Sequence, residues 1–221
     1  MSTNHRRIAA IVLPLFASLA LSSNAVAKTD TRTAAENVIQ KMTTRVLQIL
    51  HHNKGKRVTS AVKKEITEAV IPHVNFSVLS AYIMAVYWRQ MTKQQQQSFE
   101  ALIKDLLVKT YSTALKDYRG QKITVNGSQV IAKQPPIVQV NTTIDGTKNG
   151  NIPVTYALIE QHHQWKIYDV VVDGVNLVLN FREEFVPIAQ ESGIPAVLLQ
   201  LEHKLGQKLK MPAQHPATPE A

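Results

Sequence analysis

A regular spacing of apolar residues marks the first third of the chain. Over residues 33–53 they recur at intervals of three and four, and this period predicts an amphipathic helix with an apolar face formed by Ile39, Met42, Val46 and Ile49. The same spacing predicts a second helix over 59–70, which Pro72 would end because proline interrupts helical hydrogen bonding. These segments predict a helical N-terminal part.

Two further helices are predicted before residue 120. Asn75 is a suitable N-cap for a helix that runs to about Gln90. Thr92 and Gln95 have the spacing of a capping box and predict the start of the longest helix, which Gly120 would end.

Residues 121–174 follow a different pattern, rich in Val, Ile and Thr. Between 138 and 144, apolar or Thr side chains alternate with polar ones, which is typical of a strand with one face on a core. The pairs Asn126-Gly127, Asp145-Gly146 and Asn149-Gly150 indicate turns. No helical segment separates the strands, so they predict an antiparallel sheet.

The helical period returns after Gly174, over about 177–191 and again over 195–205. Helices, then a run of strands, then helices define an α+β protein, and we expect a curved antiparallel sheet with the N-terminal and C-terminal helices packed on it.

The first 27 residues are typical of a secretory signal peptide. Arg6 and Arg7 precede an apolar run from Ile8 to about Leu21, and Ala25-Val26-Ala27 has the small-residue pattern of a cleavage site. We therefore expect export, a mature chain that begins at Lys28, one domain over 28–208 and a flexible proline-rich tail over 209–221. Because the sequence contains no cysteine, it excludes disulfides, thiolate metal sites and a lipid-modified cysteine anchor.

The chain is basic, and its net charge of +9 becomes +7 without Arg6 and Arg7, the only Lys, Arg, Asp or Glu residues of the first 27. For an exported protein, anionic phospholipid surfaces are a better match to this charge than nucleic acid, and no nucleic-acid partner is expected.

Few residues indicate catalysis or metal binding. The two histidines of His51-His52, and those of His162-His163, are adjacent in sequence, and adjacent side chains point in different directions on a helix or a strand. Neither pair is therefore a natural two-ligand metal site, and no metal or cofactor is expected. Asp169 or Asp173 could act as a general base in an apolar cup, with Tyr156 or Tyr168 beside a developing oxyanion. The alternative, which we favour, is an exposed strand position for Asp169 and a turn at Asp173-Gly174.

Two segments, residues 87–125 and 165–185, resemble the MlaC family of toluene-tolerance type periplasmic lipid carriers. The residues that match the family pattern are Trp88-Arg89, Thr92 to Gln95, Tyr118 to Gln121, and Trp165 to Val175. The order and spacing also agree, so the likeness covers roughly residues 33–205.

The resemblance implies an NTF2-like or cystatin-like cup around an apolar cavity, and a non-catalytic role. Members of this family carry phospholipid between an outer-membrane lipoprotein–porin complex and an inner-membrane complex of an MCE protein and an ABC transporter. This traffic maintains outer-membrane lipid asymmetry. A relative associated with hopanoid transport leaves the lipid class open.

A lipid pocket of this kind is a diffuse apolar lining with no motif, so its members are chosen from surplus apolar positions. The predicted lining residues are Leu79, Ile83, Val86, Leu106, Tyr111, Val140, Val154, Tyr156, Val170, Val172, Val175 and Leu179. For the strand near residue 170 the sequence leaves open which side chains face the core, because a bulge near Asp169 would exchange the two faces.

Overall fold

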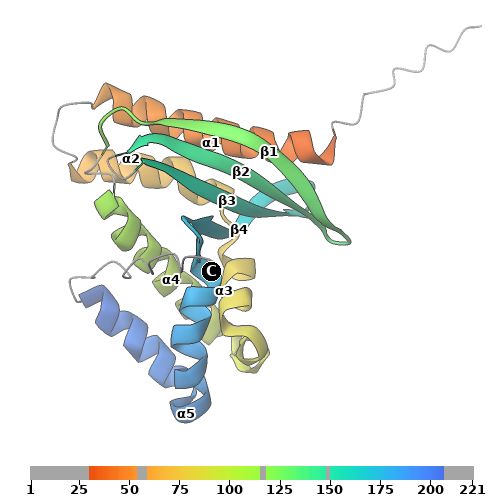
Figure 1. Ribbon diagram of the computed structural model, residues 1–221. Helices are drawn as coiled ribbons and strands as arrows, with labels where there is room; N and C mark the ends of the chain where they lie inside the picture. The colour runs from red at the N-terminus through yellow and green to blue at the C-terminus, as the bar shows by residue number, and fades with distance from the viewer. Residues whose placement is uncertain (1–29, 54–58, 115–117, 148–149, 207–221) are drawn as a thin grey trace, which may run out of the picture.

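The computed structural model describes residues 30–53, 59–114, 118–147 and 150–206, except for the side chains of 111–114. Within these ranges it is an α+β protein with a five-stranded antiparallel sheet, which confirms the predicted class (Figure 1). The predicted signal segment, the start at Lys28 and the tail over 209–221 lie outside the described residues, as does Asn149.

The first two predicted helices are confirmed as α1 (Thr31–His52) and α2 (Ser60–Val70). The side chain of Thr59 caps α2 by accepting a hydrogen bond from the backbone N–H of Val62 at 3.4 Å. The helix gives way to a short 3-10 turn, η1 (Ile71–His73), at the predicted proline.

The third helix is shorter than predicted. Asn75 caps α3 (Phe76–Met84) as expected, but Ala85 then adopts φ 50° and ψ −122°, and residues Ala85–Gln90 form the 3-10 segment η2. The prediction of a continuous helix to Gln90 is therefore wrong. The helix ends early because Ala85 adopts a backbone conformation that residues with a Cβ rarely adopt. Nothing in the composition of this segment indicates this conformation.

The predicted capping box forms at the start of α4 (Lys93–Ala114). The backbone N–H of Gln95 donates to the hydroxyl of Thr92 at 3.2 Å, and the side chain of Gln95 accepts from the N–H of Thr92 at 2.9 Å.

The sheet has the order β1-β2-β3-β4-β5, with every neighbouring pair antiparallel. Its strands are β1 (Lys122–Lys133), β2 (Pro136–Thr147), β3 (Gly150–Gln161), β4 (Gln164–Val172) and β5 (Val175–Asn176). Two of the predicted turns are wrong: Asn126 and Gly127 form a bulge inside β1, and Asp145-Gly146 lies within β2. A bulge uses the same positive φ, here 128° at Gly127, that makes glycine a turn residue.

Strand β4 contains a bulge that decides which side chains share a face. Leu158 pairs with Ile167, but its neighbour Ala157 pairs with Asp169, so Tyr168 is an extra residue without a partner on β3. As a result Ile167 before the bulge and Val170 after it lie on the same face, although their numbers differ in parity.

We call the sheet face that α1 covers the inner face. Its buried side chains pack with Ala35, Ile39 and Met42 of α1, and they are Val138, Val140, Leu158, Trp165 and Ile167. Tyr156 and Val170 are partly buried against the same cluster. The predicted alternation in β2 is thereby confirmed.

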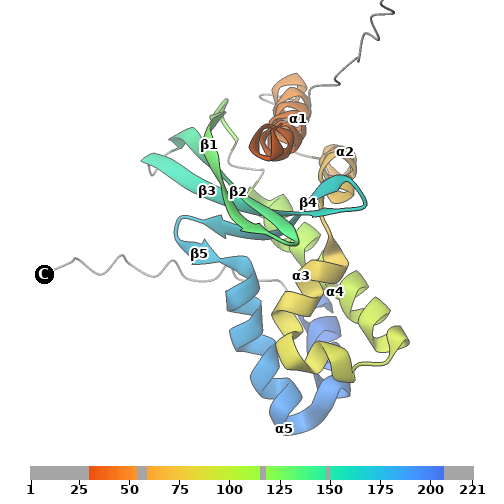
Figure 2. The same ribbon diagram turned by 90° about the vertical axis from the view of Figure 1, so that its right-hand side faces the viewer.

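A second core lies among the helices α3, α4 and α5 (Leu177–Gly206), with Phe99, Ile103 and Phe185 fully buried. Helix α5 bends at Gly193, where φ is 79°, so the two predicted C-terminal helices are confirmed as two arms of one element. Figures 1 and 2 show α3, α4 and α5 as a group below the sheet, while α1 lies along it. None of the helices in the described residues is both long and apolar enough to cross a membrane.

Strand β4 connects these two parts. The ring of Tyr168 lies 4.8 Å from that of Tyr82 in α3, and the carboxylate of Asp169 accepts a hydrogen bond at 3.3 Å from the backbone N–H of Val178 in α5. The carbonyl of Ile167 accepts another at 2.8 Å from the N–H of Asn75. The bulge thus lets one strand face the α1 core with some residues and the helical group with others.

Candidate functional site

The structure brings five of the predicted lining residues together on the inner face. Val140 pairs with Tyr156, which pairs with Val170, and Val154 pairs with Val172 in the adjacent row. Residues directly opposite each other in an antiparallel ladder project to the same face, so the five side chains form one apolar surface.

Helix α1 covers only part of this surface. Val138 and Val140 have no exposed area, and they pack with Ala35 and Ile39. Val170 and Val172 are only half-buried. The inner face therefore passes from a closed region under α1 to a region in which apolar side chains retain accessible surface.

Thr142 and Tyr156 are uncharged polar side chains within this apolar surface. Thr142, which is 1% exposed, donates its hydroxyl hydrogen bond to the carbonyl of Val154 at 3.0 Å. Burial raises the pKa of the Tyr156 phenol to about 12, while a hydrogen bond with Thr142 opposes this shift. The face is thus free of formal charge at neutral pH at this position, as an apolar ligand requires.

Three predicted residues belong to the other core. Leu79, Ile83 and Leu106 are at most 6% exposed and pack in the cluster of α3, α4 and α5, apart from the inner-face cluster. Side chains buried in this way are ordinary packing residues in this structure. Their proposed contact with a ligand remains a prediction.

The remaining predicted residues lie in different surroundings. Val86 in η2 is 69% exposed and Leu179 in α5 is 48% exposed, while Val175 is half-buried in β5. Tyr111 belongs to α4, but its side chain lies outside the described residues. The structure therefore does not gather the twelve residues into one lining.

Asp169, one of the two candidate general bases, is held by hydrogen bonds within the fold. Asp169 accepts hydrogen bonds from the side-chain amide of Asn176 at 2.5 Å and from the N–H groups of Val170 at 2.8 Å and Val178 at 3.3 Å. Burial raises its pKa, although these hydrogen bonds and Arg182 act in the opposite direction. Asp169 thus joins β4, β5 and the first turn of α5. The exposed position favoured for it from the sequence is wrong, because the residue is half-buried among these partners.

Asp173 and Gly174 occupy the turn between β4 and β5, with φ values of 51° and 79°, which confirms the turn favoured from the sequence. The Tyr156 side chain belongs to the inner-face cluster, whereas Tyr168 contacts α3, so the two phenols proposed as oxyanion donors do not converge. Burial raises the pKa of Tyr168 to about 12, with smaller contributions from Tyr82 and Asp169.

The histidine pairs do not form a ligand cluster. His162 and His163 are exposed and occupy the hairpin turn between β3 and β4, both with positive φ. Across the described part of the chain, no group of three or more His, Cys, Asp or Glu residues is arranged to hold a metal ion.

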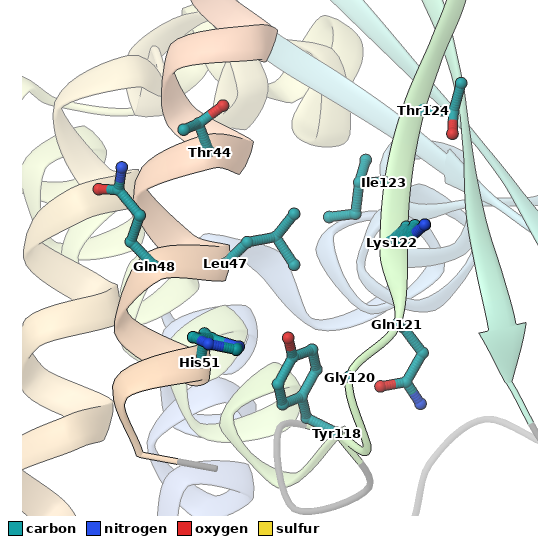
Figure 3. A pocket seen from close by; sticks show the side chains of 10 residues that line it. All are labelled: Thr44, Leu47, Gln48, His51, Tyr118, Gly120, Gln121, Lys122, Ile123 and Thr124. Atoms are coloured by element: carbon teal, nitrogen blue, oxygen red, sulfur yellow. The ribbon is translucent and has the colours of Figure 1, made fainter.

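A pocket that the sequence did not indicate lies between the second half of α1 and the start of β1 (Figure 3). It has a volume of about 640 Å³ and is open to solvent. Its lining residues are Thr44, Leu47, Gln48, His51, Tyr118, Gly120, Gln121, Lys122, Ile123 and Thr124. Leu47 and Ile123 point toward each other across it, and His51 and Tyr118 lie at one end (Figure 3). No local motif marks such a site, because it depends on where a helix leaves a sheet.

A partly covered apolar sheet face beside helices is the kind of surface on which a protein can bind an apolar ligand. The profile of the MlaC protein family matches residues 40–203, so the chain belongs to the MlaC family.

Relatives of known name agree with this assignment. The chain is 31% identical over 160 residues to the toluene tolerance protein Ttg2D of Pseudomonas putida, covering 71% of this chain and 74% of that protein. It is 21% identical over 164 residues to the intermembrane phospholipid transport system binding protein MlaC of Haemophilus influenzae, covering 72% and 75% of the two chains.

A solved structure has the same fold. The phospholipid-binding protein from Ralstonia solanacearum, determined in complex with a phospholipid, superposes with a TM-score of 0.68 at 22% identity. The match covers 78% of this chain and 97% of that one.

Proposed function

We propose that the protein is a periplasmic phospholipid carrier that takes up a lipid between its sheet and helices and moves it through water between two membranes. Membership of the MlaC family and the phospholipid bound to the Ralstonia solanacearum protein support this role. The observation that carries it in this chain is the inner face, whose apolar side chains continue beyond the cover of α1.

The energetics of lipid transfer demand such a surface. Two acyl chains contain on the order of 30 methylenes, and at about 0.8 kcal/mol each their exposure to water costs on the order of 24 kcal/mol. A diffusing carrier must shield nearly all of this surface. Apolar residues that retain accessible area in the free protein, such as Val170 and Val172, are where a chain can gain contacts without breaking a fully packed core.

The carrier acts between an outer-membrane lipoprotein–porin complex and an inner-membrane complex of an MCE protein and an ABC transporter. Such traffic requires export of the chain and maintains the lipid asymmetry of the outer membrane. Phospholipid is the proposed cargo, and a hopanoid is the alternative that lipid analysis would reveal.

Lipid extraction from freshly purified protein tests this function. Organic extraction and mass spectrometry should find about one phospholipid per protein after gentle purification. Hopanoid in its place would change the cargo, and protein without any lipid would contradict the carrier role.

A charge on the inner face should remove the lipid. Val172→Glu places a carboxylate on this face, where its burial against acyl chains is unfavourable, and we expect at least a tenfold loss of bound phospholipid. The matched control is Val171→Glu, the adjacent residue on the opposite face of β4, which should retain most of its lipid. Thermal unfolding of both variants shows whether they are folded. Equal lipid content in the two folded variants would contradict the assigned face.

A further inference from the structure

Helix α1 packs on two different partners, and the pocket in Figure 3 forms where it changes from one to the other. Its first half, with Ala35, Ile39 and Met42, packs on the sheet. Its second half, with Ile49 and Leu50, packs against α2. The beginning of β1 is therefore left without the helix cover that Val138 and Val140 have.

The apolar side of the pocket belongs to the inner face. Val125 packs against the cluster under α1, and Ile123 lies two residues earlier in the same strand, so both point to the same side. Ile123 pairs with Ile144, which pairs with Ile152. All three isoleucines are half-buried.

The adjacent row connects these isoleucines to the proposed lipid surface. Val125 pairs with Thr142, Thr142 with Val154, and Val154 with Val172. Apolar side chains therefore continue from Ile123, Ile144 and Ile152 to Val154 and Val172, with Thr142 beside them. An acyl chain that follows this path meets Thr142 as its one polar side chain, and that hydroxyl is already bonded to a carbonyl.

The rim of the pocket differs from its apolar side. Thr44, Gln48 and Tyr118 carry hydroxyl and amide groups there, His51 is a basic residue on the α1 side, and none of the ten lining residues is acidic. Lys122 also contributes to the lining, but its side chain projects to the face of β1 opposite Ile123. Asp145 is the nearest acidic neighbour in the ladder, opposite Lys122, and its carboxylate accepts a hydrogen bond from Thr124 at 2.9 Å. A phosphate at the rim thus meets donors and no lining carboxylate.

We propose that this pocket is the portal through which the acyl chains of a phospholipid enter the space between the sheet and the helices, and that the phosphate-bearing head group remains at its rim. The proposal rests on the carrier function proposed above. The volume of about 640 Å³ is within the range of roughly 300–1,000 Å³ that small-molecule sites have. The apolar row supplies the direction in which the chains extend.

A cross-link across the pocket tests the portal. The sequence has no cysteine, so Leu47→Cys combined with Ile123→Cys gives two unique thiols that a short bis-maleimide can join across the opening. The protein is first loaded with a fluorescent phosphatidylethanolamine and then cross-linked. Transfer to vesicles of phosphatidylethanolamine and phosphatidylglycerol is followed by quenching, and we expect it to slow at least tenfold.

The matched control joins the same two elements away from the pocket. Ser128 donates its hydroxyl hydrogen bond to Glu36 at 2.6 Å, where α1 and β1 are already in contact. Glu36→Cys combined with Ser128→Cys, cross-linked in the same way, should leave the transfer rate within about twofold of its unlinked form.

The outcomes separate the portal from the carrier function. If wild-type protein carries and transfers phospholipid, but the pocket cross-link does not slow transfer, the portal is contradicted and the carrier function stands. Equal slowing by both cross-links also contradicts it, because α1 would then have to leave the sheet as a whole. Wild-type protein that never holds phospholipid contradicts both proposals. Ile123→Trp, which fills the pocket without a cross-link, should slow loading of the empty protein in the same assay.

Discussion

Asp169 shows how a single side chain can be identified from the sequence for one role and have another in the structure. A carboxylate buried in an apolar cup can serve as a general base, which is the role that the position of Asp169 in the sequence suggests. In the structure, however, its oxygens accept hydrogen bonds from Asn176, Val170 and Val178 and so hold the start of α5 against β4. We therefore expect substitutions at Asp169 to change the free energy of unfolding and to loosen the packing of the start of α5 against β4.

The raised pKa of Asp169 gives this role a measurable pH dependence. Because burial lifts the folded-state pKa above the unfolded one, the folded protein binds the proton more tightly. The contribution of this group to the free energy of unfolding therefore increases as pH falls through the raised pKa toward the ordinary carboxyl range. Asn at this position has no such proton.

When the pH is lowered from 7 to 4.5, we expect the free energy of unfolding of the wild-type protein to rise relative to that of Asp169→Asn. Urea unfolding of both proteins at the two pH values measures this difference. The difference between the two proteins at one pH cancels the titration of other groups, provided that both unfold in one transition. A difference that is constant with pH, or that moves the other way, would contradict the assigned pKa direction.

Local signals in the sequence identify some residues of the site and miss others for a physical reason. Val140, Val154 and Tyr156 follow from strand alternation, and all three lie on one face. The sequence identifies Val170 and Val172 as candidate lining residues, but it does not show which face of the sheet they lie on. Only the pairing with β3 reveals the bulge at Tyr168 that decides this. Leu47 and Ile123 could not be connected at all, because 76 positions separate them and the chain carries no motif for a helix leaving a sheet.

At the scale of elements, helix α3 ends where the backbone turns and not where its apolar pattern stops. Ala85 has φ 50° and ψ −122°, a conformation that is comfortable only for glycine. A glycine at this position would have marked the helix end in the sequence. Alanine, which is the best helix former, instead supported the longer prediction.

The strain at Ala85 predicts a stabilising substitution. Ala85→Gly removes the clash of the Cβ with the backbone and should raise the free energy of unfolding by about 1 kcal/mol. Ala81→Gly, within the regular part of α3, is the control and should lower it by about the same amount. Urea unfolding of both variants provides the measurement. A loss of stability in both would show that residue 85 is helical in solution.

The strands were easier to predict than the connections between them. The alternation of side chains predicts the inner face of β2 correctly, whereas the turns predicted at Asn126-Gly127 and Asp145-Gly146 are wrong because both pairs lie within strands. Glycine dipeptides permit a positive φ, but a bulge and a turn both use it. Only the partner strand distinguishes the two cases.

At the scale of the molecule, two large hydrophobic cores of the part of the chain that the structure describes meet at β4. Among the described residues, the cluster of α3, α4 and α5 has no buried member from a strand, and the inner-face cluster has none from those helices. A substitution that destabilises one core should therefore increase local unfolding less in the other core.

Hydrogen exchange can test this separation. Ile39→Ala leaves a cavity under α1 and should destabilise the protein by about 2–5 kcal/mol. We expect amide exchange to accelerate most in α1, β2 and β3, and less in α4 and α5. Phe99→Ala, in the helical core, should show the reverse distribution. Equal acceleration everywhere in both variants would mean that the molecule opens as one cooperative unit.

The extra residue at Tyr168 also limits how the length of this chain can vary. Removal of Tyr168 would restore simple alternation and leave Val170 and Val172 on the inner face, opposite their present partners in β3. The ring contact of Tyr168 with Tyr82, which connects β4 to α3, would however be lost. Insertions and deletions should accordingly be tolerated at the tip formed by His162 and His163, but not a few positions further along the same strand.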